Sequence, residues 1–198
     1  DIILCGSMRL MDEMQERCDK PIHYFPPGVD LNLFSNNFGF QPRNEEAKIV
    51  VGCIGSLGTQ IDWGLLHALA SADERIELQF VGPVSKGAEQ DPSFQKTKRL
   101  NNVSMIGSVP HLKIPEKIRN FDICIMPYVL DSYTMGVNPL KILEYLALGK
   151  PVISSPIPAV KEFPGLVYVA TGVGEWRGQP GTALSENDEA KFLARKES

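Results

Sequence analysis

The chain has 198 residues, and 43% of them are hydrophobic, which is the composition of a globular domain with a buried core. Its formal net charge of −4 argues against a nucleic-acid-binding protein, since such proteins usually present a basic face. An anionic ligand remains compatible with this charge, because backbone N–H groups can hold a phosphate inside an acidic protein.

The N-terminal part of the chain predicts a strand, a helix and an extended segment, in that order. The apolar run at 1–5 predicts a strand, and Ser7 is a suitable N-cap for a helix that ends near Cys18. The extended segment HYFPPGVDLNLF turns at its Pro-Pro-Gly sequence, and the polar stretch at 35–46 predicts a linker. Because Asp1 already lies inside an apolar run, we expect the chain to be part of a larger protein.

Strands and helices alternate from Lys48 onward. Apolar runs predict strands at 49–54, 76–81, 103–106, 122–126, 151–154 and 167–170. Helical patterns lie between them at 62–72, 93–100, 114–120 and 140–148. This alternation predicts βαβ units, and nearly continuous hydrophobic strands indicate a sheet that is covered on both faces. We therefore predict an α/β fold, a Rossmann-like parallel sheet with helices on both faces.

Most of the predicted strands end in residues that suit a tight turn or the close approach of a ligand. These residues are Gly55, Gly82, Gly107, Pro127 and Ser154. Ligands of open α/β sheets bind at the carboxyl ends of the strands, and glycine lets a ligand approach the backbone there. Each turn taken alone is equally typical of an ordinary connection between a strand and a helix.

The first of these turns, GCIGSLG, differs from known nucleotide-binding fingerprints. Its spacing is G-x-x-G-x-x-G, whereas dinucleotide-binding proteins have G-x-G-x-x-G. The next strand, IELQFVGP, ends without the acidic residue that holds a ribose in NAD enzymes, which disfavours a Rossmann oxidoreductase. A P-loop is also disfavoured, since Gly149-Lys150 is followed by Pro151.

The segment NPLKILEYLALGKPVISS, at 138–155, carries the strongest functional signal. Pro139 stands near a helix start, and Gly149 is a suitable C-cap. Lys141 falls in the first helical turn, where a cation is unfavourable unless an anion binds nearby. Glu144 lies on nearly the same face, and a carboxylate can accept hydrogen bonds from both hydroxyls of a ribose. The alternative interpretation is a surface Lys–Glu pair of small energetic effect.

The cysteines and histidines show no spacing that indicates a metal site. Cys5, Cys18, Cys53 and Cys124 form no C-x-x-C pair, and the three histidines are scattered. We therefore predict no bound metal and no disulfide. Cys53 and Cys124 lie inside apolar strands, where cysteine usually behaves as a small buried hydrophobic residue.

The 138–155 segment resembles the donor-site helix of the group 1 glycosyltransferases, which share the GT-B fold. The sequence GCIGSLGTQIDWGLLHALA resembles the first strand, loop and helix of that family's C-terminal domain. LNNVSMIGSVPHLKIPEKIRNFDICIMPY resembles a later strand–helix–strand unit, and HYFPPGVDLNLF resembles the crossing between the two domains. These matches occur in the expected order over most of residues 1–170.

The resemblance implies a set of donor-binding residues but no assigned catalytic residue. Glu144, the second glutamate of the family's E-x7-E element, would bind the ribose hydroxyls, and Lys141 could neutralise the charge of the anion. The diphosphate and the sugar would face the loop from Thr134 to Leu140, which includes Asn138. The turn at Gly55 and Ser56 would approach the phosphates or the sugar, and the backbone near Gly107 and Val109 would contact the base. Gly136 departs from the family, because it stands where the first glutamate is expected.

The resemblance also implies a domain organisation. Residues 1–30 would be the end of an N-terminal domain and the crossing, 31–47 a linker, and 48–198 the donor-binding domain. The resemblance fades after Thr171 and stops before the family's long C-terminal helix, so we expect a truncated C-terminal end.

The function implied is transfer of a glycosyl group from a nucleotide-diphosphate sugar, with retention and without a metal or other cofactor. The expected donor is a UDP- or GDP-sugar, and the acceptor is a glycan or small molecule bound largely by another domain. We expect a role in polysaccharide biosynthesis, a cytoplasmic location with possible peripheral membrane association, and little activity of this chain alone. The alternatives are a nucleotide-sugar 2-epimerase and a non-catalytic paralogue that binds sugar nucleotides.

Overall fold

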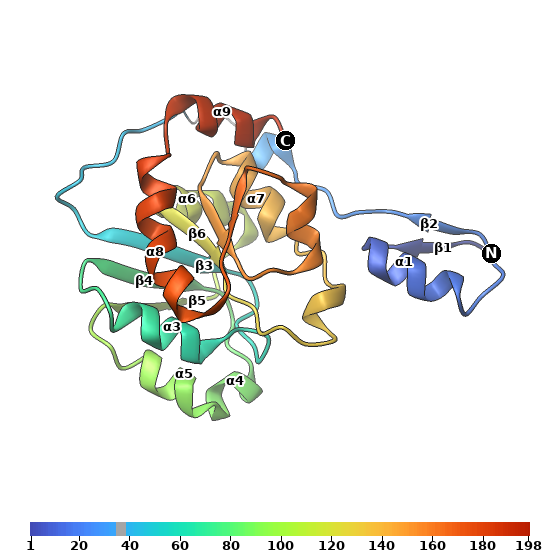
Figure 1. The fold of residues 1–198 in the computed structure, drawn as a ribbon, viewed down its shortest axis with the longest axis horizontal. Helices are drawn as coiled ribbons and strands as arrows, with labels where there is room; N and C mark the ends of the chain where they lie inside the picture. Colours follow the sequence, from blue (N-terminus) through green and yellow to red (C-terminus); the bar gives the residue numbers. More distant parts are fainter. Residues whose placement is uncertain (35–38) are drawn as a thin grey trace.

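The main body of the molecule is a six-stranded parallel sheet (Figure 1). The computed structural model describes residues 1–34 and 39–198. The strand order is β5-β4-β3-β6-β7-β8, and each neighbouring pair is parallel. The strands are β3 (Ile49–Ile54), β4 (Ile76–Val81), β5 (Val103–Gly107), β6 (Ile123–Met126), β7 (Val152–Ser154) and β8 (Val167–Val169). The predicted Rossmann-like sheet is therefore confirmed.

Helices cover both faces of this sheet, as predicted (Figure 1). One face is covered by α3 (Trp63–Ala70), α5 (Pro92–Thr97) and α8 (Gly172–Ser185), and the other by α6 (Ile114–Arg119) and α7 (Lys141–Ala147). The remaining helices are α2 (Leu31–Phe34), α4 (Lys86–Gln90) and α9 (Glu189–Lys196), and α2 and α9 pack against α7. No helix among the described residues is both long enough and apolar enough to cross a membrane.

A separate hydrophobic core fills each side of the sheet. On the first side, the Trp63 ring packs at 5.3 Å from the Phe80 ring and at 4.8 Å from the Phe94 ring, measured between centroids. Cys53 lies in this core and Cys124 in the other, and both are fully buried, which confirms the prediction for these two side chains. Burial of this much apolar surface is the main stabilising term for such a domain.

The first 24 residues form a small unit beside the main sheet (Figure 1). It consists of β1 (Ile3–Cys5), α1 (Met8–Gln15) and β2 (Ile22–Tyr24), and the two strands pair in parallel. The predicted strand and helix are confirmed, including Ser7 as the N-cap, whose Oγ accepts a hydrogen bond from the Leu10 N–H at 3.3 Å. An isolated two-stranded sheet is only marginally stable, so this unit depends on contacts with the rest of the protein.

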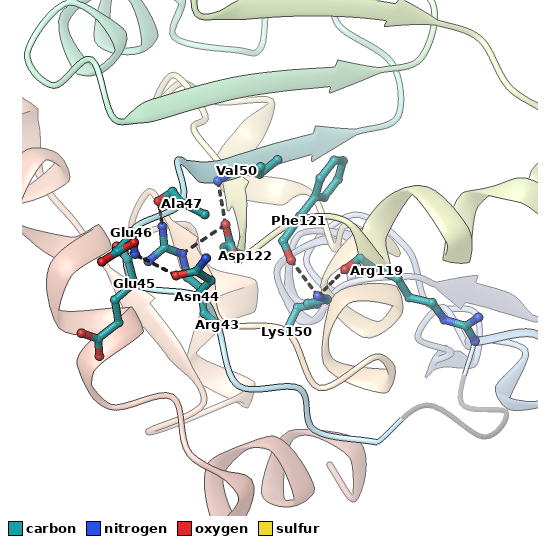
Figure 2. Close-up of polar contacts among 10 residues, drawn as sticks. All are labelled: Arg43, Asn44, Glu45, Glu46, Ala47, Val50, Arg119, Phe121, Asp122 and Lys150. Carbon is teal, nitrogen blue, oxygen red and sulfur yellow. Dashed lines mark hydrogen bonds and ion pairs between the residues drawn. The ribbon is translucent and has the colours of Figure 1, made fainter.

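The segment that precedes β3 is attached to the amino ends of the sheet strands (Figure 2). The Arg43 Nε lies 3.5 Å from the Asp122 Oδ2, and the same carboxylate accepts a hydrogen bond from the Val50 N–H at 2.8 Å. The expected linker at 31–47 thus contains helix α2 and an anchored stretch, while its residues 35–38 lie outside the described part of the chain. The polar cluster lies at the end of the sheet that is opposite to the carboxyl ends of the strands.

Helix α9 completes the far end of α7. Gly149 has φ +68° and acts as the C-cap glycine of α7, and a Cβ atom there would lie 2.3 Å from the Phe192 ring. The buried Arg195 of α9 donates a hydrogen bond to the Gly149 carbonyl at 3.2 Å and another to the Asn187 side-chain oxygen at 2.7 Å. The last helices of the chain are therefore part of the domain and not a separate tail.

Candidate functional site

A cavity of about 930 Å³ opens at the carboxyl ends of β3 and β6. The strand order reverses between these two strands, because the chain runs outward from β3 to β5 and then returns to the other side of β3. Open α/β sheets bind their ligands at such a switch point. The sheet-domain residues that line the cavity are Ile54, Gly55, Ser56, Gln60, Tyr128, Ser132, Tyr133, Gly136, Val137, Asn138, Pro139, Leu140, Lys141 and Glu144.

Helix α7 places two of the predicted site residues in this cavity. Lys141 is its first residue, and Glu144 follows one turn later. Leu140, which is also a predicted site residue, occupies the N-cap position and lines the cavity. Pro139 precedes it, as a helix start allows. The sequence prediction therefore places the helix start within one residue of its position in the structure.

Glu144 is a buried carboxylate that the protein leaves available for a ligand. Its side chain is only 7% exposed, and it accepts no hydrogen bond from any residue that the structure describes. Burial raises the pKa of its carboxyl above the usual value, and the charges of His111 and Lys141 partly offset this effect. The Glu144 oxygens are not among the described buried side-chain atoms that lack a partner, so they open into the cavity, where a ligand that donates hydrogen bonds can reach them.

The Lys141 ammonium lies beside the glycine turn that follows β3. A Cβ atom on Gly55 would be 3.4 Å from the Lys141 Nζ, and this Nζ is 5.5 Å from the centroid of the Tyr128 ring. Burial alone would lower the pKa of Lys141, but Cys53, Tyr128 and Glu144 together raise it above its usual value. A raised pKa favours the charged, ammonium form of this side chain.

The glycine turn itself is fixed by close backbone packing. Gly55 has φ +101°, a conformation that favours glycine, and its N–H donates a hydrogen bond to the Val81 carbonyl at 2.9 Å. Gly82 has φ +140°, and a Cβ atom there would lie 1.9 Å from the Gly55 carbonyl oxygen. Ser56 follows Gly55 and lines the cavity, and its carbonyl accepts a hydrogen bond from the Gln60 side chain at 2.9 Å. Both predicted residues of this turn thus face the same space as Lys141.

The loop before α7 contains two predicted residues that the structure uses for internal contacts. Thr134 is fully buried, and its hydroxyl donates to the Val129 carbonyl and accepts from the Asp131 N–H at 3.0 Å. It lies outside the cavity lining and holds the loop together. Asn138 lines the cavity, but its side-chain N–H group donates to the Gly6 carbonyl and to the Tyr24 hydroxyl.

Gly107 is the last residue of β5 and Val109 lies in the loop that follows it, and neither residue lines the cavity. The same loop carries His111, whose charge lowers the pKa of Glu144, and the His111 ring packs at 5.8 Å from the Phe34 ring. The loop therefore lies near Glu144, although none of its residues lines the cavity. Six of the nine predicted residues line the cavity: Glu144, Lys141, Leu140, Asn138, Gly55 and Ser56.

The opposite wall of the cavity comes from the β1–α1–β2 unit and from the segment 25–28 that follows it, and this wall was not predicted from the sequence. Its lining residues are Gly6, Ser7, Arg9, Leu10, Glu13, Phe25, Pro26, Pro27 and Gly28. Arg9 and Glu13 form an ion pair of 2.9 Å at i,i+4 spacing, and Phe25 is 66% exposed. In the sequence, the i,i+4 spacing of Arg9 and Glu13 after the Ser7 cap could have indicated one face of a helix. It could not have indicated that this face lines a ligand site.

The charged side chains that helix α7 brings to the site are one carboxylate and one ammonium. In the described ranges, 1–34 and 39–198, no three His, Cys, Asp or Glu side chains come together as metal ligands. The cavity instead pairs one carboxylate with one ammonium on the same helix. Such an arrangement can accept hydrogen bonds from hydroxyl groups and can neutralise a negatively charged group about one helical turn away.

Comparison with known proteins gives a consistent family. Residues 48–195 match the family model described as glycosyl transferases group 1. The chain is 32% identical over 168 residues to TuaH of Bacillus subtilis (strain 168), a glycosyltransferase assigned to teichuronic acid biosynthesis. That match covers 82% of this chain and 42% of TuaH, so the chain spans less than half the length of this curated relative.

Solved structures share the fold at low sequence identity. HepE of Anabaena, in a complex with UDP and glucose, superposes with a TM-score of 0.74 and 18% identity over 98% of this chain and 58% of HepE. The sucrose-phosphate synthase of Thermosynechococcus elongatus also gives a TM-score of 0.74, with 16% identity over 98% of this chain and 54% of that enzyme. At these identities the likeness establishes the fold and does not assign a substrate.

Proposed function

Because the chain belongs to the group 1 glycosyltransferases, which are GT-B transferases, we propose that its cavity binds a nucleotide-diphosphate sugar as the glycosyl donor. One observation carries this proposal: Glu144 and Lys141 lie one helical turn apart in the same cavity at the switch point of the sheet. The carboxylate would accept hydrogen bonds from the ribose hydroxyls, and the ammonium would neutralise the diphosphate. The complex of HepE with UDP and glucose supports this class of ligand.

Lys141 would also contribute to the chemical step. When the bond between the sugar and the diphosphate breaks, negative charge grows on the leaving phosphate oxygen. A fixed cation beside that oxygen stabilises the transition state more than the ground state. The Gly55 turn lies next to the Lys141 Nζ and would let the phosphates come close to the backbone. We propose that transfer proceeds without a metal, since Lys141 supplies the positive charge, and with retention, as the family resemblance implies.

The acceptor would enter from the wall that Arg9, Leu10 and Phe25 contribute. The chain spans 42% of TuaH and 58% of HepE, so we propose that residues beyond these 198 complete acceptor recognition. The similarity to TuaH supports a glycan acceptor in polysaccharide biosynthesis. A membrane-attached acceptor glycan would bring the full-length protein to the membrane surface.

Gly136 favours a second candidate function, which is donor binding without transfer. It lines the cavity, and no described atom lies within 4 Å of the Cβ position there, so the wall presents open space where a side chain would fit. A paralogue that only senses sugar nucleotides would bind the donor and transfer nothing. Release of free nucleoside diphosphate by the full-length protein, in the presence of an acceptor glycan, would exclude this candidate.

Calorimetric titration with UDP, GDP, ADP and TDP tests the donor-site proposal. We expect selective binding of one diphosphate by the parent chain and loss of that binding in Glu144→Ala. Glu89→Ala is a matched control, because Glu89 is exposed on helix α4, away from the cavity, and should bind like the parent. Equal binding by the parent and by Glu144→Ala would show that the site is misplaced.

A further inference from the structure

Three hydrogen bonds join the β1–α1–β2 unit to the loop that leads into α7. The Ser7 Oγ donates to the Gly136 carbonyl at 2.8 Å. The Asn138 Nδ2 donates to the Gly6 carbonyl at 3.1 Å and to the Tyr24 hydroxyl at 3.2 Å. Each bond connects residues that are more than a hundred positions apart in the sequence. They therefore act between two separately packed parts of the molecule.

Tyr24 is held from both sides. Its hydroxyl accepts the hydrogen bond from Asn138 and donates its own proton to the Glu162 carboxylate, with 3.2 Å to each carboxylate oxygen. Glu162 belongs to the short helix η3 (Pro158–Glu162), which follows β7. Burial and the Glu162 charge raise the pKa of Tyr24, so the hydroxyl keeps the proton that this bond requires. One tyrosine thus connects β2 with both the loop before α7 and the segment after β7.

The orientation of the β1–α1–β2 unit depends on few other contacts. Its strands and helix pack mainly against one another. Ile2, Leu4 and Met8, which would cover a neighbouring hydrophobic surface, are 63%, 54% and 46% exposed. The polar bonds of Ser7, Asn138 and Tyr24 are therefore a major part of what fixes the unit. This unit and the segment 25–28 that follows it line one side of the cavity, so the orientation of the unit affects the width of the cavity.

We propose that Tyr24, acting through Asn138, is a positioning residue that holds the β1–α1–β2 wall at a fixed distance from α7. The wall carries Arg9 and Glu13, whereas the opposite side carries Lys141 and Glu144. A ligand that spans the cavity needs both sides at a fixed separation. Loss of the hydrogen bond between Asn138 and Tyr24 would let the β1–α1–β2 wall move away from α7. The inference rests on the proposed function in one respect, which is that the cavity is treated as the site of the glycosyl donor.

Distance measurement between two spin labels tests this inference without any ligand. Labels would be placed at Gln15→Cys on α1 and at Lys96→Cys on α5, both exposed positions, in a Cys18→Ser background. The other cysteines, Cys5, Cys53 and Cys124, are buried and should not react. Double electron–electron resonance then gives the distribution of distances between the two labels, and hence between the unit and the sheet domain.

Tyr24→Phe and Asn138→Ala should each broaden this distribution and add a population at longer distance. Loss of one partly exposed hydrogen bond shifts the ratio of held to released molecules by about two- to tenfold. The double variant should broaden the distribution by more than Asn138→Ala alone, because the bond from Tyr24 to Glu162 is also lost, but by less than the sum of the two single effects, because the bond between Tyr24 and Asn138 is shared. The melting temperature of the sheet domain should stay nearly constant, which separates positioning from general destabilisation.

Tyr168→Phe is the matched control, because the Tyr168 hydroxyl also donates to a carboxylate, that of Glu186, at 2.9 Å. This bond lies within the sheet domain, so its loss should leave the label distances unchanged. A Tyr24→Phe distribution identical to that of the parent would overturn the inference. Failure of every nucleotide to bind the parent would contradict the proposed function alone, since the distance measurement needs no nucleotide.

Discussion

The Tyr145 hydroxyl accepts a hydrogen bond from the backbone N–H of Ile54 at 2.9 Å, and both residues are buried. Residue pairing between β3 and β6 ends with Gly52 and Cys124, so Tyr145 supplies an acceptor beyond the end of that ladder. Gly55 and Ser56 follow directly, and Lys141 and Glu144 lie on the same helix as Tyr145. This bond therefore fixes the two halves of the polar cavity wall relative to each other.

Replacement of Tyr145 by Phe should destabilise the protein by about 1–3 kcal/mol, because the buried Ile54 N–H would lose its partner while the ring volume stays the same. Urea unfolding would measure the change. Tyr168→Phe removes a solvent-exposed bond and should cost about 0.5 kcal/mol or less. Equal effects of the two substitutions would contradict the role given to Tyr145.

Gly82→Ala should be strongly destabilising, by about 3 kcal/mol or more, because a positive φ and a backbone clash act together. Gly165 is the matched control: its φ is +76°, but no described atom lies within 4 Å of its Cβ position. Gly165→Ala should therefore cost only about 1–2 kcal/mol. Thermal unfolding of both variants separates the clash with Gly55 from the conformational penalty, and similar melting temperatures would refute the clash.

Glu144→Gln should raise stability at neutral pH and change it little near pH 4. Burial raises the pKa of Glu144 above its ordinary value of 4.5, so the folded protein binds this proton more tightly than the unfolded chain does. Stability consequently falls as the pH rises from the ordinary pKa through the raised one, and glutamine removes that decrease. We expect the melting temperature of the variant to exceed that of the parent by about 1–3 °C at pH 7.

Thermal unfolding at both pH values measures this difference. If Glu144→Gln shows a difference from the parent that is independent of pH, the carboxyl of Glu144 does not titrate as its burial implies.

Lys141→Met should weaken binding of the preferred nucleoside diphosphate by roughly tenfold or more, since a hydrogen bond to a charged group contributes about 1.5–3 kcal/mol. Calorimetry at neutral pH would measure this loss. Equal affinity of the parent and of Lys141→Met would argue against a Lys141–diphosphate contact.

Asp122→Ala should destabilise the sheet domain by about 1–2 kcal/mol and leave nucleotide affinity unchanged. The substitution removes the acceptor of the Val50 N–H and the partner of Arg43, both at the end of the sheet away from the cavity. Arg43→Ala should have less effect in the Asp122→Ala background than in the parent, because the two residues share one ion pair. Additive effects in chemical denaturation would show that they are not coupled.

The sequence was sufficient to locate the sheet and helix α7. β3 is a continuous apolar run and β4 is rich in apolar residues, each is followed by a glycine, and both predicted ranges agree with the structure. The Pro139 and Gly149 signals likewise placed both ends of α7 within about one residue. These features are local, so periodicity and turn residues are enough to find them.

Helix α8 could not be predicted, because its own residues disfavour it. It contains Gly174, Gly178 and Pro180, which are poor helix formers, yet Trp176 is buried in the core against the sheet. Tertiary packing of that one ring outweighs the local propensities. The same limit applies to the site, since the wall formed by α1 and the internal use of Thr134 depend on contacts between distant segments.

The dependence of Gly149 on Arg195 has a consequence for synthesis of the protein. The carbonyl that ends α7 receives its hydrogen bond from a residue made 46 positions later, and the ring that packs on Gly149 belongs to the same late helix. While the ribosome is still translating the residues between Gly149 and Arg195, α7 can form only without the hydrogen bond and the ring contact at its C-terminal end. A pause before α9 emerges would thus expose the incomplete helix α7 to chaperones and proteases.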